Sequence, residues 1–501
     1  MRDSSLPPRL VFRGDGSART GLGHIMRLLA LAEIAGAVFE RRFVVRPGLP
    51  PATLRELHAA TDDNVGELPA DLPLAEEAAW LAAHELRPTD TLVLDGYSFD
   101  FAYQTRVRAA VGALVYLDDL AAFPQAADAV INPAGGAATG NYDLRRAGAR
   151  LLHGPAWAPL RAPFYVAGAA EKPALGAVDT VLLCLGGADL PNRTRHRAAD
   201  LLAVPGIEAL HVVVGGAYGH WAELKAWAAT QAPRLTLHRA LSAEALAPLM
   251  QTCGAAVVSA STVSYEYASV GGLLTVVLTA DNQRGLHDFL LREGLARPAA
   301  ALPNILSAPD SAHTQALLWA AQKQWFDGEA PARLRQLLRG LAAQAQLQLR
   351  PVTGADSALL LAWANEPLVR AASYQTAPIT AAEHAHWLPA RLADDAHLLL
   401  LADVAGQPAG TIRFALDAAA GTATVSFLVA PAYRGLNLAA ALLLAGTAAA
   451  VRRWPAARWV VGHVQRGNAA SLAAFRRAGF TEFSHDATPP DSVSFRVPAA
   501  V

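Results

Sequence analysis

The chain has 501 residues, 53% of them hydrophobic and 17% charged, and its formal net charge at pH 7 is −1. This length predicts about three domains with enough apolar residues for large cores. The balanced charge gives no indication of nucleic acid or of an anionic membrane as a partner. The N-terminus lacks the build of a signal peptide, and no apolar run reaches the roughly 18 residues that span a membrane. We therefore expect a soluble cytoplasmic protein.

The first third of the chain alternates short apolar runs with helical patterns. One helical pattern runs from His24 to about Val38, and the strand-like runs lie at 9–13, 41–46, 90–97, 112–120 and 128–133. Continuous apolar strands between helices are typical of a parallel α/β sheet. A stretch rich in Pro, Trp and Ala follows at 153–164, and the small residues at 166–176 indicate a linker.

The same rhythm resumes after the predicted linker. Strand-like runs lie at 179–189, 209–216, 234–240, 254–261 and 273–283, and a helical pattern at 331–346 closes this part. We predict two Rossmann-like halves, residues 1–165 and 175–345, with a ligand cleft at the carboxyl ends of their strands. Cys184 and Cys253 lie in apolar runs, which indicates buried free thiols rather than a disulfide or a metal site.

Residues 347–501 have a different order of elements. A strand and helices come first, and three consecutive strand patterns at 396–406, 407–417 and 421–431 follow. A helix, a strand at 457–464 and another helix complete the unit. This order predicts an α+β domain with a central antiparallel meander.

The first chemical motif lies at residues 11–27, between a strand and a helix. Gly21 and Gly23 allow close approach of a ligand to the backbone, and the helix start offers free N–H groups, so the motif predicts an anion site. His24 can exchange a proton with water or a leaving group there, or it can be a structural residue at a helix start. Met26 stands where a dinucleotide fingerprint needs its third glycine, which disfavours that fingerprint.

This motif resembles that of the hydrolases that release UDP from a UDP-linked diacetamido-trideoxy-altropyranose in pseudaminic acid biosynthesis. The matching positions are Arg13, Asp15, Ser17, Gly21, Gly23, His24 and Arg27. Further matches follow in order, at 94–100, 117–121, 127–133, 152–164, 184–194 and 280–283. The resemblance covers about residues 9–330 and implies a GT-B type fold in which His24 is catalytic.

Hydrolysis at the anomeric carbon fits these residue types. The C–O cleavage places negative charge on UDP, which backbone amides and a helix start stabilise, while His24 activates water without a metal. Asp15 can orient His24 or bind sugar, or it can serve only the loop turn. Arg13, Gly21 and Gly23 are expected to contact the substrate.

The second half is expected to bind UDP. Ser261, Thr262 and Ser264 open a helix and can offer hydroxyls and amides to phosphates, or simply cap that helix. The resemblance places Glu266 at the ribose and Asn282 near the substrate. Asn192 is a further candidate, and Gly186 and Gly187 are expected to let the chain approach the ligand.

Residues 425–443 resemble the acetyl-CoA-binding core of the GNAT N-acetyltransferases. The resemblance spans about 347–485 and implies that the edge of the strand at Leu428 and Val429 takes the pantetheine arm. The loop of Arg434, Gly435, Leu436, Asn437, Leu438 and Ala439 is implied to hold the pyrophosphate through its amides. Asn437 replaces a glycine of the family pattern, and Asn tolerates left-handed backbone.

A second GNAT motif lies at residues 463–480. Asn468 and Ser471 match its coenzyme contacts. Phe475 stands where the family often has a tyrosine that protonates the leaving thiolate, so another group serves, the thiolate leaves unaided, or the domain binds without turnover.

The start of this unit, residues 361–388, resembles the sugar-modifying branch of these acetyltransferases. His384, His386 and Trp387 can contact the acceptor, or they can belong to a packed helix. The sequence thus predicts a bifunctional enzyme that N-acetylates a 4-amino UDP-sugar with acetyl-CoA and then hydrolyses UDP away. The alternatives are a GT-B glycosyltransferase, and an active hydrolase with a non-catalytic acetyl-CoA-binding module.

Overall fold

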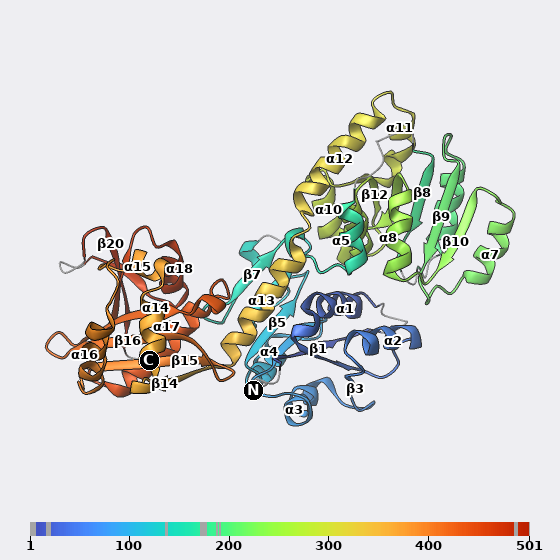
Figure 1. Ribbon diagram of the computed structural model, residues 1–501. Helices are drawn as coiled ribbons and strands as arrows, with labels where there is room; N and C mark the ends of the chain where they lie inside the picture. The colour runs from blue at the N-terminus through green and yellow to red at the C-terminus, as the bar shows by residue number, and fades with distance from the viewer. Residues whose placement is uncertain are drawn as a thin grey trace. The chain divides into compact units, whose positions relative to one another are not determined.

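The computed structural model describes residues 7–16, 22–135, 139–170, 178–186, 189, 192–484 and 489–499. The described chain divides into two compact units (Figure 1). The larger unit comprises residues 7–145 and 149–335, and the smaller comprises 146–148 and 336–501. None of the described helices is both long and apolar enough to cross a bilayer.

The first sheet of the larger unit is parallel, with strand order β3-β2-β1-β4-β5-β6-β7 in the described residues. Its strands are β1 (Arg9–Gly14), β2 (Glu40–Val45), β3 (Val65–Glu67), β4 (Thr91–Asp95), β5 (Ala113–Leu117), β6 (Ala129–Asn132) and β7 (Arg150–His153). Its helices are α1 (Gly23–Ala35), α2 (Pro51–Ala60), α3 (Leu74–His84) and α4 (Phe101–Arg108). Every residue of β1, β4 and β5 is buried, which explains their continuous apolar runs.

The second sheet is also parallel, with the order β10-β9-β8-β11-β12-β13. Its strands are β8 (Thr180–Cys184), β9 (Ala209–Val214), β10 (Leu235–Arg239), β11 (Ala255–Ser259), β12 (Leu273–Val277) and β13 (Arg297–Pro298). Its helices are α5 (Ala162–Ala169), α6 (Arg193–Leu202), α7 (Trp221–Ala229), α8 (Ala243–Thr252), α9 (Thr262–Val270), α10 (Arg284–Arg292), α11 (Leu302–Ser307) and α12 (Ser311–Trp325). Two Rossmann-like parallel sheets are thus confirmed, and Cys184 and Cys253 are buried as expected, with no disulfide between cysteines in the part of the chain that the structure describes.

Helix α5 differs from the sequence prediction, which assigned residues 166–176 to a linker. Residues 166–169 instead continue α5, whose Phe164 and Ala167 lie in the same apolar core as residues of α8 and α9. Gly168 has no room for a Cβ because it lies against the carbonyl of Ser269. The small residues that indicated a linker therefore serve close helix packing; 171–177 lie outside the described residues.

The smaller unit contains one mixed sheet, with the order β14-β15-β16-β17-β18-β20-β19 in the described residues. Its strands are β14 (Leu347–Pro351), β15 (His397–Val404), β16 (Gln407–Asp417), β17 (Thr422–Val429), β18 (Trp459–Gln465), β19 (Thr481–Phe483) and β20 (Ser492–Pro498). Strands β14 to β17 form the predicted antiparallel meander. Its helices are α14 (Ser357–Ala364), α15 (Pro367–Ala371), α16 (Ala381–Leu392), α17 (Leu438–Arg453) and α18 (Ala469–Arg477), and α13 (Ala330–Ala345) enters the unit at Gln336.

Candidate functional sites

His24 lies in the first turn of α1, beside the carboxyl ends of β1 and β4. These two strands pair so that Gly14 stands opposite Asp95, the last residue of β4. Nδ1 of His24 is 2.6 Å from Oδ1 of Asp95, and the side chain of His24 keeps 21% of its surface exposed. In the tautomer in which Nδ1 carries the proton and donates it in a hydrogen bond to Asp95, the other ring nitrogen, Nε2, is the one left for chemistry.

Arg27 fixes the carboxylate that holds His24. Its Nε and one terminal nitrogen donate to Asp95 at 2.9 and 2.6 Å, and its other terminal nitrogen donates to Asp119 at 3.1 Å. The ring of Tyr97 meets the His24 ring edge-on at a centroid distance of 4.7 Å, and its hydroxyl is 3.3 Å from Asp119. The group is thus a packed, partly exposed histidine, built from the start of α1 and the ends of β4 and β5.

Asp15 belongs to a neighbouring group of charges. Its carboxylate pairs with Arg13 at 2.7 Å and accepts a hydrogen bond from Ser98 at 3.1 Å. The carboxylate on His24 is therefore Asp95, a residue that we singled out only as part of the 94–100 match. Its signal was its place at the end of a buried strand.

Arg13 has no exposed surface. Its guanidinium donates to both carboxylate oxygens of Glu77, at 2.8 and 3.0 Å, and to the carbonyl of Gly14 at 2.5 Å. We predicted that Arg13 contacts substrate; the structure buries its side chain and pairs it with Asp15, and the substrate contact stays a prediction. Gly23 has open space where a Cβ would stand, while Ser17 and Gly21 lie outside the described residues.

The predicted UDP site begins at Ser261, the N-cap of α9. The hydroxyls of Ser259 and Ser261 are 3.0 Å apart, and Ser264 donates its hydroxyl to the Ser261 carbonyl at 2.7 Å. In the described chain, the N–H groups of Thr262 and Val263 have no protein acceptor. An anion at this helix start would therefore meet amides and hydroxyls together.

Glu266 follows one turn further along α9 and is partly buried. Loss of hydration raises the pKa of its carboxyl to about 7, and Arg161 opposes this rise. Gly186 lies near Ser259 with φ +99°, a backbone conformation that glycine adopts most readily. Gly187 lies outside the described residues.

The two asparagines differ in their surroundings. Asn192 takes a left-handed conformation before α6, accepts a hydrogen bond from Tyr218, and places its amide 3.4 Å from Glu223. Asn282 donates to the hydroxyl of Tyr97 at 3.4 Å. Asn282 therefore contacts Tyr97, whose ring packs against His24. The side chain of Asn192 contacts Tyr218 and Glu223 instead.

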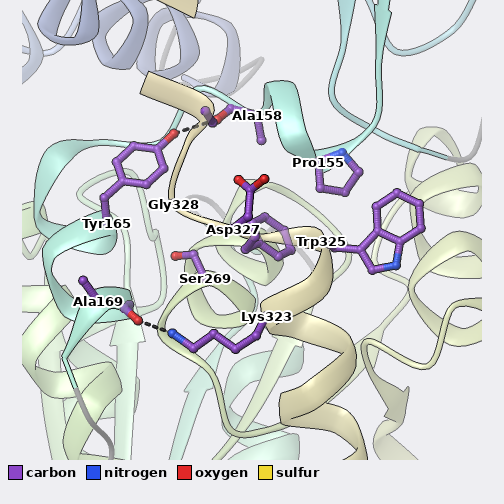
Figure 2. A pocket seen from close by; sticks show the side chains of 12 residues that line it. Pro155, Ala158, Tyr165, Ala169, Ser269, Lys323, Trp325, Asp327 and Gly328 are labelled. Atoms are coloured by element: carbon purple, nitrogen blue, oxygen red, sulfur yellow. Dashed lines mark hydrogen bonds between the residues drawn. The ribbon is translucent and has the colours of Figure 1, made fainter. Parts of the chain in front are cut away.

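A separate cavity of about 310 Å³ lies between α5, α9 and the end of α12 (Figure 2). Tyr165 and Lys323 line it, and both give their polar ends to backbone carbonyls, of Ala158 and Gly168 respectively. Asp327, which also lines the cavity, is ion-paired with Arg333. None of the predicted site residues lines this cavity.

In the smaller unit, β17 and β18 pair only over their first residues. Parallel pairing joins Thr422–Thr424 to Trp459–Val461, and β17 then continues to Val429 with a partner on one side only, β16. Leu428 and Val429 pair with Thr411 and Gly410 of β16. Among the described residues no strand pairs with their other edge, which leaves it available to an extended ligand, and the placement of the pantetheine arm there stays a prediction.

The loop that follows β17 leads directly into α17. Asn437 adopts φ +57°, the left-handed conformation expected for it, and is the N-cap of α17. Leu436 and Leu438 are buried, so only their backbone can serve a ligand. Arg434 is ion-paired with Glu366, and Arg477 donates to Oδ1 of Asn437 at 2.5 Å. Ala439 lies in the first turn of α17.

The second GNAT motif forms α18 and its cap. Asn468 caps the helix by accepting the N–H of Ser471 at 3.1 Å. Phe475, 2% exposed, stacks on Phe495 and meets Phe480 edge-on, at centroid distances of 5.1 and 5.0 Å. Phe475 is therefore a core residue.

The candidate acceptor residues lie on α16. His384 is buried and 3.2 Å from the Ser357 hydroxyl, and burial lowers its pKa. His386 is exposed. Trp387 lies under the guanidinium of Arg413, 5.7 Å from ring centre to Cζ. His384 thus matches the packed-helix alternative, and Trp387 contributes to a surface with Arg413.

Comparison with known proteins identifies the smaller unit. Residues 346–481 match the family model described as an acetyltransferase (GNAT) domain. This stretch is therefore a GNAT acetyltransferase domain, and this part of the sequence prediction is confirmed. No curated protein matches the chain.

Two of the solved structures similar to part of this chain are acetyltransferases by their descriptions. The spermidine N-acetyltransferase of Vibrio cholerae, solved with CoA and spermine, is 16% identical; the match covers 31% of this chain and 97% of that one, with a TM-score of 0.29. An aminoglycoside acetyltransferase solved with coenzyme A is 19% identical, with coverage of 30% and 94% and a TM-score of 0.28.

Proposed function

We propose that the chain is a bifunctional enzyme of nonulosonic, specifically pseudaminic, acid biosynthesis. The smaller unit N-acetylates a 4-amino UDP-sugar with acetyl-CoA, and the larger unit hydrolyses the resulting UDP-linked diacetamido-trideoxy-altropyranose. The observation that carries the hydrolase proposal is the hydrogen bond between His24 and Asp95 at the start of α1. The GT-B type of the larger unit belongs to the same proposal.

His24 would act as the general base. Nε2 takes a proton from water, the water oxygen forms a bond to the anomeric carbon, and the C–O bond to UDP breaks with its electron pair passing to the phosphate. Asp95 keeps the proton of His24 on Nδ1 and stabilises the imidazolium that forms, because a carboxylate on one ring nitrogen fixes the tautomer. Arg27 holds Asp95 in place at 2.6 and 2.9 Å.

The start of α9 would receive the UDP leaving group. The amides of Thr262 and Val263 and the hydroxyl of Ser261 offer donors for pyrophosphate oxygens, and the helix dipole favours negative charge there. Glu266, one turn later, would accept hydrogen bonds from ribose hydroxyls. These donors are fixed by the fold, so they stabilise the charge on UDP without reorganising.

The acetyltransferase would place coenzyme A along the open edge of β17, with its pyrophosphate on the amides of the 434–439 loop. The acceptor amine attacks the thioester carbonyl, the C–S bond breaks, and the proton that the amine loses passes to the thiolate or to solvent. Phe475 has no proton to give and is buried, so this step uses no tyrosine at that position.

The charge around Arg413 favours an anionic acceptor. Loss of hydration lowers the pKa of Arg413, and the charges of Arg370 and Arg391 lower it further, so these three cations influence one another. Arg413 donates to Ser426 of β17 at 2.5 Å and covers Trp387. A nucleotide-linked amine would be attracted to this surface, whereas a polyamine cation would be repelled.

Two assays test the proposal. Release of UDP from the diacetamido UDP-sugar without any acceptor is expected; a requirement for an acceptor sugar would indicate a glycosyltransferase instead. Thiol release from acetyl-CoA is expected with the 4-amino UDP-sugar and not with spermidine. Binding of acetyl-CoA without thiol release would indicate a non-catalytic module.

The role of Arg413 has its own control. Arg413→Gln is expected to raise KM for the UDP-sugar about ten-fold and leave KM for acetyl-CoA unchanged. Arg458→Gln changes the same charge on an exposed guanidinium whose hydrogen-bond partner among the described residues is the Ala420 carbonyl. An equal effect of both substitutions would contradict a specific role for Arg413.

A further inference from the structure

One face of α13 contacts three successive residues of the loop between β17 and α17. Gln336 donates to the carbonyl of Gly435 at 2.9 Å, and Gln344 donates to the carbonyl of Asn437 at 3.4 Å. Between them, Gly340 lies so close to the Leu436 carbonyl that a Cβ on it would stand 2.5 Å from that oxygen. Positions four apart share one face of a helix, so these contacts form a single strip.

The contact is continuous with a buried apolar cluster. Ala343 of α13 lies in one core cluster with Val404, Ala409, Leu436 and Leu438. Apolar packing against Leu436 and Leu438 as well as the two hydrogen bonds therefore holds α13 against this loop. All of these residues belong to the smaller unit.

Peptide geometry gives this strip a consequence for ligand binding. In a trans peptide the C=O of one residue and the N–H of the next point in opposite directions. Carbonyls of Leu436 and Asn437 that face α13 therefore aim the N–H groups of Asn437 and Leu438 away from it. Neither N–H has a protein acceptor in the part of the chain that the structure describes, whereas Leu436 N–H is bonded to the Tyr433 carbonyl at 3.4 Å.

We propose that α13 is part of the acetyl-CoA site, and that Gln336, Gly340 and Gln344 are positioning residues that hold the loop carbonyls so that the opposite amides face the pyrophosphate. The proposal rests on the proposed binding of acetyl-CoA at this loop. Residues 336–345 precede the GNAT match, which begins at 346. The functional acetyltransferase unit therefore begins earlier in the chain than its family domain.

Coenzyme A binding by the full-length protein tests this proposal, with calorimetry as the readout. Gly340→Val forces its side chain against the Leu436 carbonyl and is expected to weaken coenzyme A binding at least about ten-fold. Gln336→Glu with Gln344→Glu keeps side-chain size but replaces both donors by carboxylates, and about a ten-fold loss is expected.

Two controls separate positioning from charge and from folding. Gln346→Glu places one such negative charge, half of that in the double variant, at the end of this region, where no side-chain hydrogen bond joins Gln346 to the loop in the described structure. It is expected to leave binding within about two-fold. Arg339→Ala changes an exposed residue of the same helix. In the positioning variants, KM for acetyl-CoA is expected to rise while KM for the acceptor and the rate of UDP release stay unchanged.

The outcomes distinguish failure of the proposed function from failure of this inference. Wild-type protein that fails to bind coenzyme A overturns the proposed function on which this inference rests. If the wild-type protein binds coenzyme A and the Gln336→Glu, Gln344→Glu double variant binds it with the same affinity, the inference alone is overturned. This holds whether or not Gly340→Val folds. An equal loss in Gln346→Glu assigns the effect to charge and also overturns it.

Discussion

Asp95 accepts a hydrogen bond from Nδ1 of His24 at 2.6 Å while Arg27 donates twice to the same carboxylate. If His24 is the base, His24→Ala is expected to lower UDP release by about 10²–10⁴-fold, and Asp95→Asn by a comparable factor. UDP affinity is expected to stay within about two-fold in both variants, because neither residue lies on α9. Steady-state UDP release and calorimetric UDP binding measure the two quantities.

Asp15→Asn is the matched control for Asp95→Asn. Asp15 bonds Arg13 and Ser98 rather than His24, so its loss is expected to cost far less in turnover. If Asp15→Asn removed turnover and Asp95→Asn left it intact, the assignment of the orienting carboxylate would be reversed.

A buried ion pair beneath this site predicts a large effect on stability. Glu77 has no exposed surface and accepts hydrogen bonds from Arg13, Arg46 and Tyr103. Glu77→Ala would remove the buried carboxylate that Arg13 contacts twice and leave Arg13, among the described residues, only the part-exposed Asp15 as a charged partner. Loss of one partner of a buried ion pair typically costs about 3–5 kcal/mol. Urea unfolding followed by tryptophan fluorescence is expected to show an earlier transition, and Glu76→Ala, on the exposed side of α3, is the control. Equal transitions in the two variants would contradict this account.

The positions of the strands along the chain were predictable because most of these strands are buried on both faces. β1, β4, β5 and β11 each have a central run of at least three apolar residues, a pattern that local sequence shows directly. The short β3 and the half-exposed β7 carry no such run. The end of helix α5 was missed because it consists of small residues, and Gly168 allows close contact with the Ser269 carbonyl of α9. Composition alone cannot distinguish such close packing from a flexible linker.

The candidate site was predictable only where it is local in sequence. His24 and Asn437 stand inside short motifs, and the left-handed conformation of Asn437 was expected from its residue type. Asp95 lies 71 positions from His24, and only the pairing of β1 with β4 brings them together. In the same way, the contact between Gln336 and Gly435 spans 99 positions, so no motif predicts it.

Glu266 predicts a pH dependence of stability. Its pKa is raised from 4.5 to about 7 in the folded chain by loss of hydration. Between these values the folded state holds a proton that the unfolded state has released, so this group's contribution to stability falls as pH rises. Glu266→Gln cannot ionise, and its thermal midpoint relative to wild type is expected to rise from pH 5 to pH 8. A difference that is independent of pH would contradict the raised pKa.

Phe475 stands where the resembled family often has a proton-donating tyrosine. Its surroundings indicate whether this position belongs to an active site or to the core. The tip of its ring lies against Gly462, where no Cβ would fit, and Phe427, Phe480 and Phe495 surround it. Phe475→Tyr would press a hydroxyl into this packing, and without a partner that hydroxyl costs about 1–3 kcal/mol.

We therefore expect Phe475→Tyr to lower the thermal midpoint and leave the rate of thiol release from acetyl-CoA unchanged. Phe483→Tyr, at a partly exposed ring on β19, is the control and is expected to change neither. A faster thiol release in Phe475→Tyr with wild-type stability would show instead that the position reaches the thiolate. The leaving thiolate would then need a proton donor that Phe475 does not provide. Protonation of the thiolate would in that case limit acetyl transfer by the natural protein.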